Sequence, residues 1–221
     1  MLVSGGLDSA VLLAAAARQG PVRALYVSVG FAWEAEERAM AARLFSRPPL
    51  AGAVDRLEEL SFDMRDVFPP EHWAMRGTPP AADTPDEDVY LDGRNVILLS
   101  KAAVYLASAT RRSPAALRPM RLLMGQLAGN PFPDATPAFL ESMARALSLG
   151  LGERMDVEMP FAAKRKSDVI RLGVELRVPL ELTLSCMQPH GGLHCGRCSK
   201  CRERRDAFRE AGVDDPAEYL R

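Results

Sequence analysis

Short apolar runs alternate with amphipathic stretches along most of the chain. Apolar, β-rich runs predict strands at residues 1–3, 22–29, 57–62, 122–125 and 155–159. Helical patterns predict helices at residues 8–18, 33–45, 94–109, 137–149, 167–176 and 200–211. Strands that alternate with helices form parallel sheets, so the pattern predicts an α/β fold: a Rossmann-like parallel sheet with helices on both faces.

Two segments interrupt this alternation. Residues 69–92 are rich in Pro, Asp and Glu and follow neither a strand nor a helix period. We interpret them as a long loop, and loops of that length are often functional. A second loop is expected at residues 126–137, where Pro133 and Asp134 follow a Gly-Asn-Pro-Phe sequence.

Composition narrows the functional classes. Hydrophobic residues make up 48% of the 221 residues, which suffices for a sizeable core. The 28 basic and 29 acidic residues nearly cancel, which argues against a dedicated nucleic-acid binder. Apolar runs stay well short of the roughly 20 residues of a membrane span. Gly5, Gly6 and Asp8 break the first apolar run, so we expect no signal peptide and a cytoplasmic protein.

The first candidate site is the turn Ser4-Gly5-Gly6-Leu7-Asp8-Ser9, between a strand end and a helix start. Glycines let backbone amides approach a ligand closely, and a helix N-terminus favours anions, so the turn suits phosphate. Ser4 and Ser9 add hydroxyl donors. Asp8 would repel bare phosphate but could bind a bridging Mg²⁺. The alternative is a tight turn in which Asp8 or Ser9 caps the helix.

This turn resembles the SGGxDS loop of the N-type ATP pyrophosphatases, the PP-loop superfamily. The resemblance implies an adenine nucleotide alpha hydrolase-like fold. It also implies that residues 4–9 hold the β- and γ-phosphates of ATP. A substrate oxygen then attacks the α-phosphorus, giving an adenylate and pyrophosphate.

All four cysteines lie near the C-terminus, as Cys186, Cys195, Cys198 and Cys201, with C-x8-C-x2-C-x2-C spacing. Two-residue gaps let one loop present successive thiolates to a single Zn²⁺, and four protein ligands indicate a structural site. An iron–sulfur cluster and four unrelated buried thiols remain alternatives. We therefore divide the chain into an ATP-binding domain at residues 1–180 and a zinc-binding segment at residues 181–221.

Together the two motifs resemble the 7-cyano-7-deazaguanine synthase (QueC/ExsB) family over nearly the whole chain. Further matching segments are residues 93–95, 133–134, 166–173, 179–186, 195–198 and 211–216. The resemblance implies that ATP and ammonia convert 7-carboxy-7-deazaguanine to the nitrile, on the route to queuosine. It also implies a homodimer.

Three further residues become candidates through this resemblance. Lys166 and Arg94 would neutralise the negative charge that develops when a carboxylate meets ATP. Asp134 would accept hydrogen bonds from the amidine edge of a guanine-like base, or instead cap the helix that follows Thr136.

Other functions stay open on the sequence alone. The chain could be another N-type enzyme that acts on a different deazapurine or on tRNA. It could be a zinc-containing nucleic-acid or protein-binding module that uses residues 200–209 as a basic face. It could also be a sensor that binds ATP without turnover.

Overall fold

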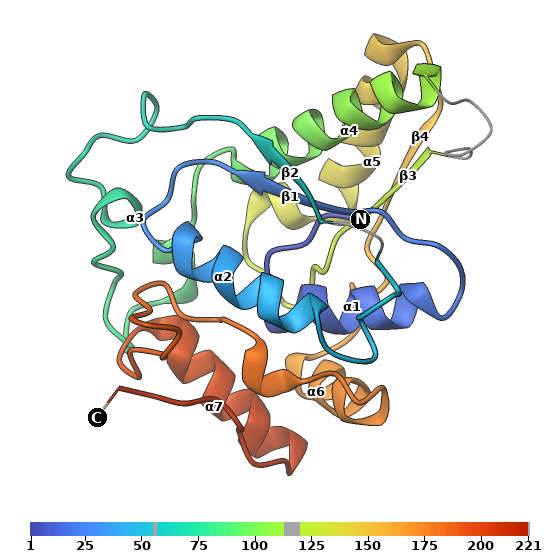
Figure 1. The fold of residues 1–221 in the computed structure, drawn as a ribbon. Helices are drawn as coiled ribbons and strands as arrows, with labels where there is room; N and C mark the ends of the chain where they lie inside the picture. The colour runs from blue at the N-terminus through green and yellow to red at the C-terminus, as the bar shows by residue number, and fades with distance from the viewer. Residues whose placement is uncertain (55–56, 113–119, 221) are drawn as a thin grey trace.

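Helices cover both faces of a central sheet in the computed structural model, which describes residues 1–54, 57–112 and 120–220 (Figure 1). The strands are β1 (Ala24–Ser28), β2 (Leu57–Ser61), β3 (Met120–Leu123) and β4 (Met155–Glu158). The α-helices are α1 (Leu7–Ala17), α2 (Glu34–Phe45), α3 (Trp73–Arg76), α4 (Arg94–Arg112), α5 (Pro137–Leu151), α6 (Lys166–Glu175) and α7 (Ser199–Ala211). Short 3₁₀ helices are η1 (Asp86–Val89), η3 (Pro133–Ala135) and η4 (Leu180–Leu182).

The N-terminal residues 1–3 join two parallel strand pairs into one sheet. β1 pairs with β2 and β3 pairs with β4, both in parallel. Leu2 bridges Leu25 in parallel, and its N–H donates to the carbonyl of Leu123 at 3.0 Å. The order across the sheet is therefore β2, β1, residues 1–3, β3, β4. The predicted α/β fold with a parallel sheet is confirmed.

This order has a switch point between residues 1–3 and β3. The strands β1 and β2 lie on one side of that point, and β3 and β4 lie on the other. Ligands of such sheets bind outside the carboxyl ends of the strands at that point. Gly125 follows β3, and a Cβ there would lie 3.3 Å from the backbone of Asp8 and Ser9. Gly125, in the loop after β3, thus lies directly against the first turn of α1.

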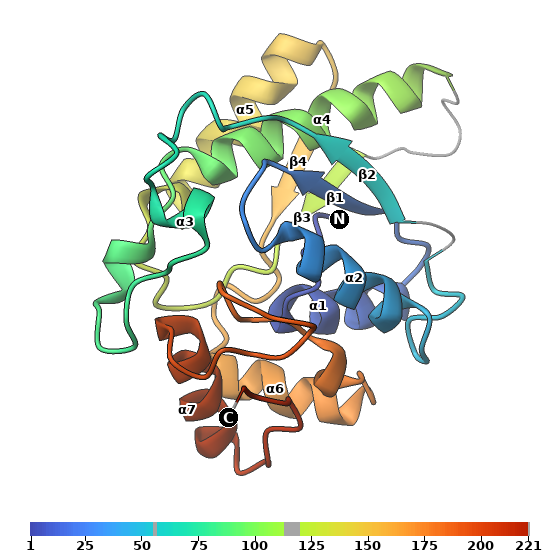
Figure 2. The same cartoon turned by 60° about the vertical axis from the view of Figure 1, so that its left-hand side comes forward.

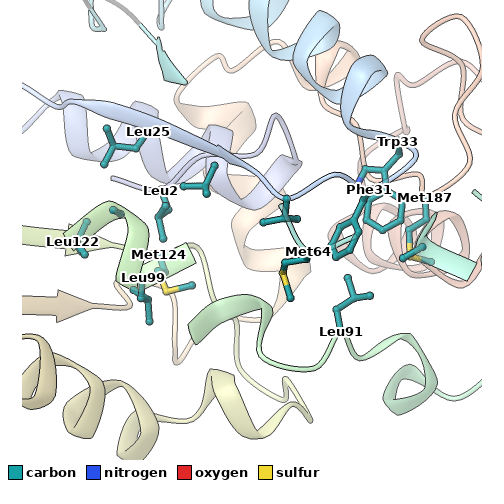
Figure 3. Close-up of a cluster of buried hydrophobic side chains, with 14 of the residues drawn as sticks. Leu2, Leu25, Phe31, Trp33, Met64, Leu91, Leu99, Leu122, Met124 and Met187 are labelled. Atoms are coloured by element: carbon teal, nitrogen blue, oxygen red, sulfur yellow. The ribbon is translucent and has the colours of Figure 1, made fainter. Parts of the chain in front are cut away.

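The helices form layers around the sheet. α4 and α5 lie on one face and α1 and α2 on the other, while α6 and α7 lie beyond α1 (Figures 1 and 2). The core on the α4 side includes Leu2, Leu25, Leu99, Leu122 and Met124 at one end and Phe31, Trp33, Leu91 and Met187 at the other (Figure 3). A second core joins α1 to α6 and α7 through Leu7, Val11, Leu13, Val169, Ile170 and Phe208.

Most of the predicted elements form within a few residues of their expected ends. The predicted loop at residues 69–92 instead contains α3 and η1. His72 caps α3 by accepting from the N–H of Ala74 at 3.2 Å, and so short an element shows no periodicity in sequence. The division at residue 180 stays a prediction, and both cores include residues from either side of it.

Within the described residues, the helices are too short or too polar to cross a membrane.

Candidate active site

A cavity of about 420 Å³ opens at the switch point of the sheet. The glycine turn, the start of α4, the loop after β3, and residues of α6 and α7 form its walls. Candidates from separate parts of the sequence meet there: Ser4, Gly6, Leu7, Asp8, Arg94, Asp134, Lys166 and Cys186. A second hollow of about 180 Å³ adjoins it and is lined by Ser9 as well as Ser4 and Asp8.

The glycine turn is held by its own serines. The hydroxyl of Ser9 donates to the carbonyl of Gly6 at 2.9 Å and accepts from the N–H of Ser4 at 3.2 Å. Gly5 has a φ of +69°, and a Cβ there would lie 3.0 Å from the carbonyl oxygen of Glu37, so glycine suits this position. Leu7 is buried in the core, so only its main chain could serve a ligand.

The start of helix α1 is open to a ligand. Gly6 is its N-cap residue, and no side chain in the described part of the protein caps it. The predicted alternative, capping by Asp8 or Ser9, therefore does not occur. Uncapped N–H groups and the positive end of the helix dipole make this position favourable for an anion.

Asp8 and Lys166 form an ion pair that continues into helix α7. The Lys166 Nζ lies 3.2 Å from Oδ2 of Asp8 and 2.8 Å from Oε1 of Glu203. The Nζ of Lys200 lies 2.8 Å from the other oxygen of Glu203. Oδ1 of Asp8 is buried and has no hydrogen-bond partner among the described residues. One carboxylate oxygen is therefore left for a cation.

Burial and charge act against each other in this group. Burial raises the pKa of Asp8 although Lys166 opposes the rise. Burial lowers the pKa of Lys166, but Asp8 and Glu203 outweigh it, so the net pKa is raised and the lysine stays a cation. Burial would raise the pKa of Glu203, yet Lys166 and Lys200 lower it to about 2.

A second charged group, Glu37 and Arg94, lines the same cavity as the turn. The hydroxyl of Tyr26 donates to Oε2 of Glu37 at 2.8 Å. Burial raises the pKa of Glu37 to about 7, although Arg94 and Tyr26 oppose the rise. The Nε of Arg94 is buried without a hydrogen-bond partner in the described structure. This unpaired donor, in the cavity wall, is well placed to meet an anionic ligand.

Asp134 binds the start of α4. The backbone N–H of Asn95 donates to its Oδ2 at 3.1 Å, and the Asn95 side chain donates to its Oδ1 at 3.1 Å. The helix after Thr136 is capped by Thr136 itself, which accepts from the N–H of Phe139 at 3.2 Å. Asp134 therefore does not cap that helix. Its predicted contact with a base would have to share oxygens that already accept hydrogen bonds.

Aromatic side chains line the cavity on the side of α3. Trp33 and Trp73 stack with ring centroids 5.7 Å apart and an angle of 12° between their planes. Tyr90 and Phe132 form a second pair, with centroids 5.3 Å apart. Flat apolar faces of this kind suit the rings of a nucleobase-like ligand.

The four cysteines form one buried cluster beside the cavity. Their Sγ atoms all lie within 4.8 Å of one another, with 3.5 Å between Cys198 and Cys201 and 4.0 Å between Cys195 and Cys201. A tetrahedron of thiolates around one Zn²⁺ has edges of about 3.8 Å, so the cluster fits a single ion. The N–H groups of Gln188 and Cys195 donate to the sulfur of Cys186, each at 3.2 Å. The cluster could therefore hold a metal such as zinc.

Several residues of the cavity are absent from the sequence-based candidates. The sequence places Lys200 and Glu203 only within a candidate basic face at residues 200–209, but both side chains line the cavity. Glu37 also lines the cavity, although no sequence motif marks it. Their position depends on contacts between distant elements, such as α6 with α7, which no local pattern encodes.

The chain is similar to a known family along most of its length. The model of a family described as "Queuosine biosynthesis protein QueC" matches residues 1–212. A 7-cyano-7-deazaguanine synthase of Methanoculleus marisnigri is 35% identical and covers 100% of this chain and 97% of the relative. One of Methanopyrus kandleri is 34% identical with 100% and 97% coverage. One of Anaeromyxobacter dehalogenans is 31% identical with 100% and 95% coverage.

Proposed function

The chain belongs to the QueC family of queuosine biosynthesis proteins, and from this premise we propose that it converts 7-carboxy-7-deazaguanine and ammonia to 7-cyano-7-deazaguanine at the expense of ATP. The observation that carries the proposal is the meeting of the open start of α1, Asp8, Lys166 and Arg94 in one cavity. It is thus an ATP-dependent carbon–nitrogen ligase.

The glycine turn binds the β- and γ-phosphates through the N–H groups at the start of α1. Lys166 and Arg94 face the phosphates and the developing charge at the α-phosphorus. Asp8 would hold Mg²⁺, since its Oδ1 lacks a partner among the described residues. When bound, this ion neutralises phosphate charge and thereby lets an anionic carboxylate approach.

The reaction takes two activations. The substrate carboxylate attacks the α-phosphorus and forms an acyl adenylate with release of pyrophosphate. Ammonia attacks the acyl carbon, AMP leaves, and a proton is lost, which gives the amide. The amide oxygen then attacks the α-phosphorus of a second ATP and forms an adenylate with release of a second pyrophosphate. Loss of AMP and protons from that adenylate gives the nitrile.

The planar substrate binds between the glycine turn and the aromatic wall. Trp33, Trp73 and Tyr90 offer faces for stacking, and stacking on an aromatic side chain contributes about 1–3 kcal/mol per base. Asp134 lines the cavity and is our candidate for accepting hydrogen bonds from the amidine edge of the substrate. The amide-forming step needs the acyl carbon to stay out of reach of water, and this apolar wall serves that purpose.

The four cysteines hold a structural Zn²⁺. Four thiolates leave no open coordination position, so the ion takes no part in the reaction. Arg205 donates to the carbonyl of Gly196, between two of the ligands, and its positive charge helps to offset that of the thiolates. The ion fixes the loops that carry Leu184 to Met187 against the cavity.

The nucleic-acid alternative loses its main support because the cations of α7 have partners within the chain. Lys200 binds Glu203, and Arg209 binds Asp206 at 2.8 Å. Arg204 binds Asp215 at 3.0 Å, and Arg205 donates to the carbonyl of Gly196 at 2.7 Å. A homodimer and a cytoplasmic location stay predictions.

The proposal is tested by supplying ATP, Mg²⁺ and ammonium with 7-carboxy-7-deazaguanine, its amide, or an unrelated acid. Pyrophosphate release and the mass of the products are followed together. We expect two pyrophosphates for each nitrile formed from the carboxylate and one from the amide. Accumulation of the amide alone would support a relative that stops there. Pyrophosphate release that ignores both deazapurines would refute the proposal.

A further inference from the structure

Glu203 of α7 lies between two lysines at the edge of the candidate active site. Its Oε1 lies 2.8 Å from Nζ of Lys166, and its Oε2 lies 2.8 Å from Nζ of Lys200. Lys166 also reaches Oδ2 of Asp8 at 3.2 Å. The side chains are only 16–28% exposed and line the same cavity. This four-residue set, the Glu203 group, joins α1, α6 and α7.

The group solves a conflict between Asp8 and Lys166. A lysine that pairs only with Asp8 would neutralise the carboxylate that has to bind a cation. Glu203 lies closer to Nζ of Lys166 than Asp8 does, and Oδ1 of Asp8 is buried without a partner in the described structure. The two lysines balance the two carboxylates of the group in formal charge, and both ammonium groups lie at the cavity that the turn lines.

The cysteine cluster adjoins the Glu203 group and holds its α7 residues in position. Lys200 and Glu203 flank Cys201, and Cys198 is the N-cap residue of α7. The N–H of Leu184, two residues before Cys186, donates to the carbonyl of Gly5 at 3.0 Å. α6 and α7 lie side by side beyond α1 (Figure 2). The segment that carries the cysteines is thus docked directly on the glycine turn.

We propose that Glu203 is a positioning residue that shares Lys166 with Asp8, and that Lys200 is a further cation for the phosphates of ATP. The inference rests on the proposed function. It goes beyond that function because it assigns residues of helix α7 a role in binding ATP. The cysteine cluster then contributes to the ATP site by positioning α7.

The test compares Glu203→Gln with Asp206→Asn, a charge-removing control on the same helix. Asp206 is 54% exposed and pairs only with Arg209 among the described residues. Two quantities are measured on metal-loaded protein: the Kd for ATP by calorimetry at several Mg²⁺ concentrations, and the Mg²⁺ dependence of pyrophosphate release. Metal content and the unfolding midpoint are recorded for each variant.

We expect E203Q to need about tenfold more Mg²⁺ for half-maximal binding and turnover, because Lys166 then pairs with Asp8 alone. D206N keeps the wild-type Mg²⁺ dependence. Glu203→Asp keeps the charge and recovers part of the loss. A merely structural role would lower the unfolding midpoint without moving the Mg²⁺ dependence. An E203Q protein that matches D206N in Mg²⁺ dependence would overturn the inference.

Lys200→Gln supplies a second test should E203Q lose its metal. This change leaves the Lys166–Glu203 pair in place and is expected to weaken ATP binding about tenfold. Equal affinity of K200Q and wild type would overturn the role of Lys200. Calorimetry needs no deazapurine, so a wild type that binds ATP but ignores deazapurines would defeat the proposed function alone. A wild type that does not bind ATP would defeat both.

Discussion

Replacing Arg204 with Met removes the cation that ties helix α7 to the rest of the protein. The Arg204 side chain is 0% exposed, and its Nε lies 3.0 Å from Oδ1 of Asp215. It also donates to the hydroxyl of Thr183 at 2.8 Å and to the carbonyl of Leu180 at 3.0 Å. Its guanidinium lies 4.9 Å from the centroid of the Phe208 ring.

The loss of folding stability in R204M follows from the polar groups that lose their partner. Asp215 has a side chain only 11% exposed, and it would keep hydrogen bonds from Tyr219 and the N–H of Ala217. Breaking a buried pair by removing one partner costs about 3–5 kcal/mol. In a protein of this length each kcal/mol shifts Tm by about 2–4 °C, so we expect Tm to fall by about 6–20 °C.

Thermal unfolding followed by circular dichroism measures this change, with Arg209→Met as the control. Arg209 is 78% exposed and pairs with Asp206, so R209M should alter stability by about 0.5 kcal/mol or less. The double variant R204M/D215N should recover part of the loss because it removes the unpaired charge. A Tm of R204M within about 2 °C of that of R209M would refute the reasoning.

Three further changes have distinct outcomes. Cys198→Ser should release the metal and unfold the C-terminal segment, since structural zinc contributes about 10 kcal/mol or more in small domains. Metal analysis and circular dichroism check this change. A variant that stays folded without metal would contradict it. Asp8→Asn should lower pyrophosphate release about 10²-fold or more while Tm stays the same or rises, because burial already disfavours the charged Asp8. Burial raises the pKa of Glu37 from 4.5 to about 7, so the unfolded chain loses this proton first and stability falls by about 3 kcal/mol between pH 4.5 and 8. Urea unfolding should show that Glu37→Gln lacks this fall, and an identical pH dependence in the variant would count against it.

Local patterns were enough to predict the sheet and both motifs. The strand–helix alternation, the turn at residues 4–9 and the cysteine spacing each occupy a short stretch of sequence. A metal cluster follows from such spacing because neighbouring ligands share one loop. The position of residues 1–3 in the middle of the sheet follows from their pairing with both Leu25 and Leu123.

Contacts between distant elements could not be predicted in this way. Glu203 lies in a mixed-charge helix whose sequence marks no site, and the packing of α7 against α6 brings it to Lys166. Trp33 and Trp73 are 40 residues apart, and their stacking depends on the short helix α3 within an aperiodic segment. Asp134 binds the start of α4 rather than its own neighbouring helix, which depends on how the two loops meet.

The central claim is that the start of α1 holds the phosphates of ATP. A crystal structure with Mg²⁺ and a non-hydrolysable ATP analogue tests it most directly. We expect phosphate oxygens within about 3 Å of the backbone nitrogens of residues 6–9, with Lys166 and Oδ1 of Asp8 close to them. A triphosphate bound elsewhere, with this turn empty, would contradict it.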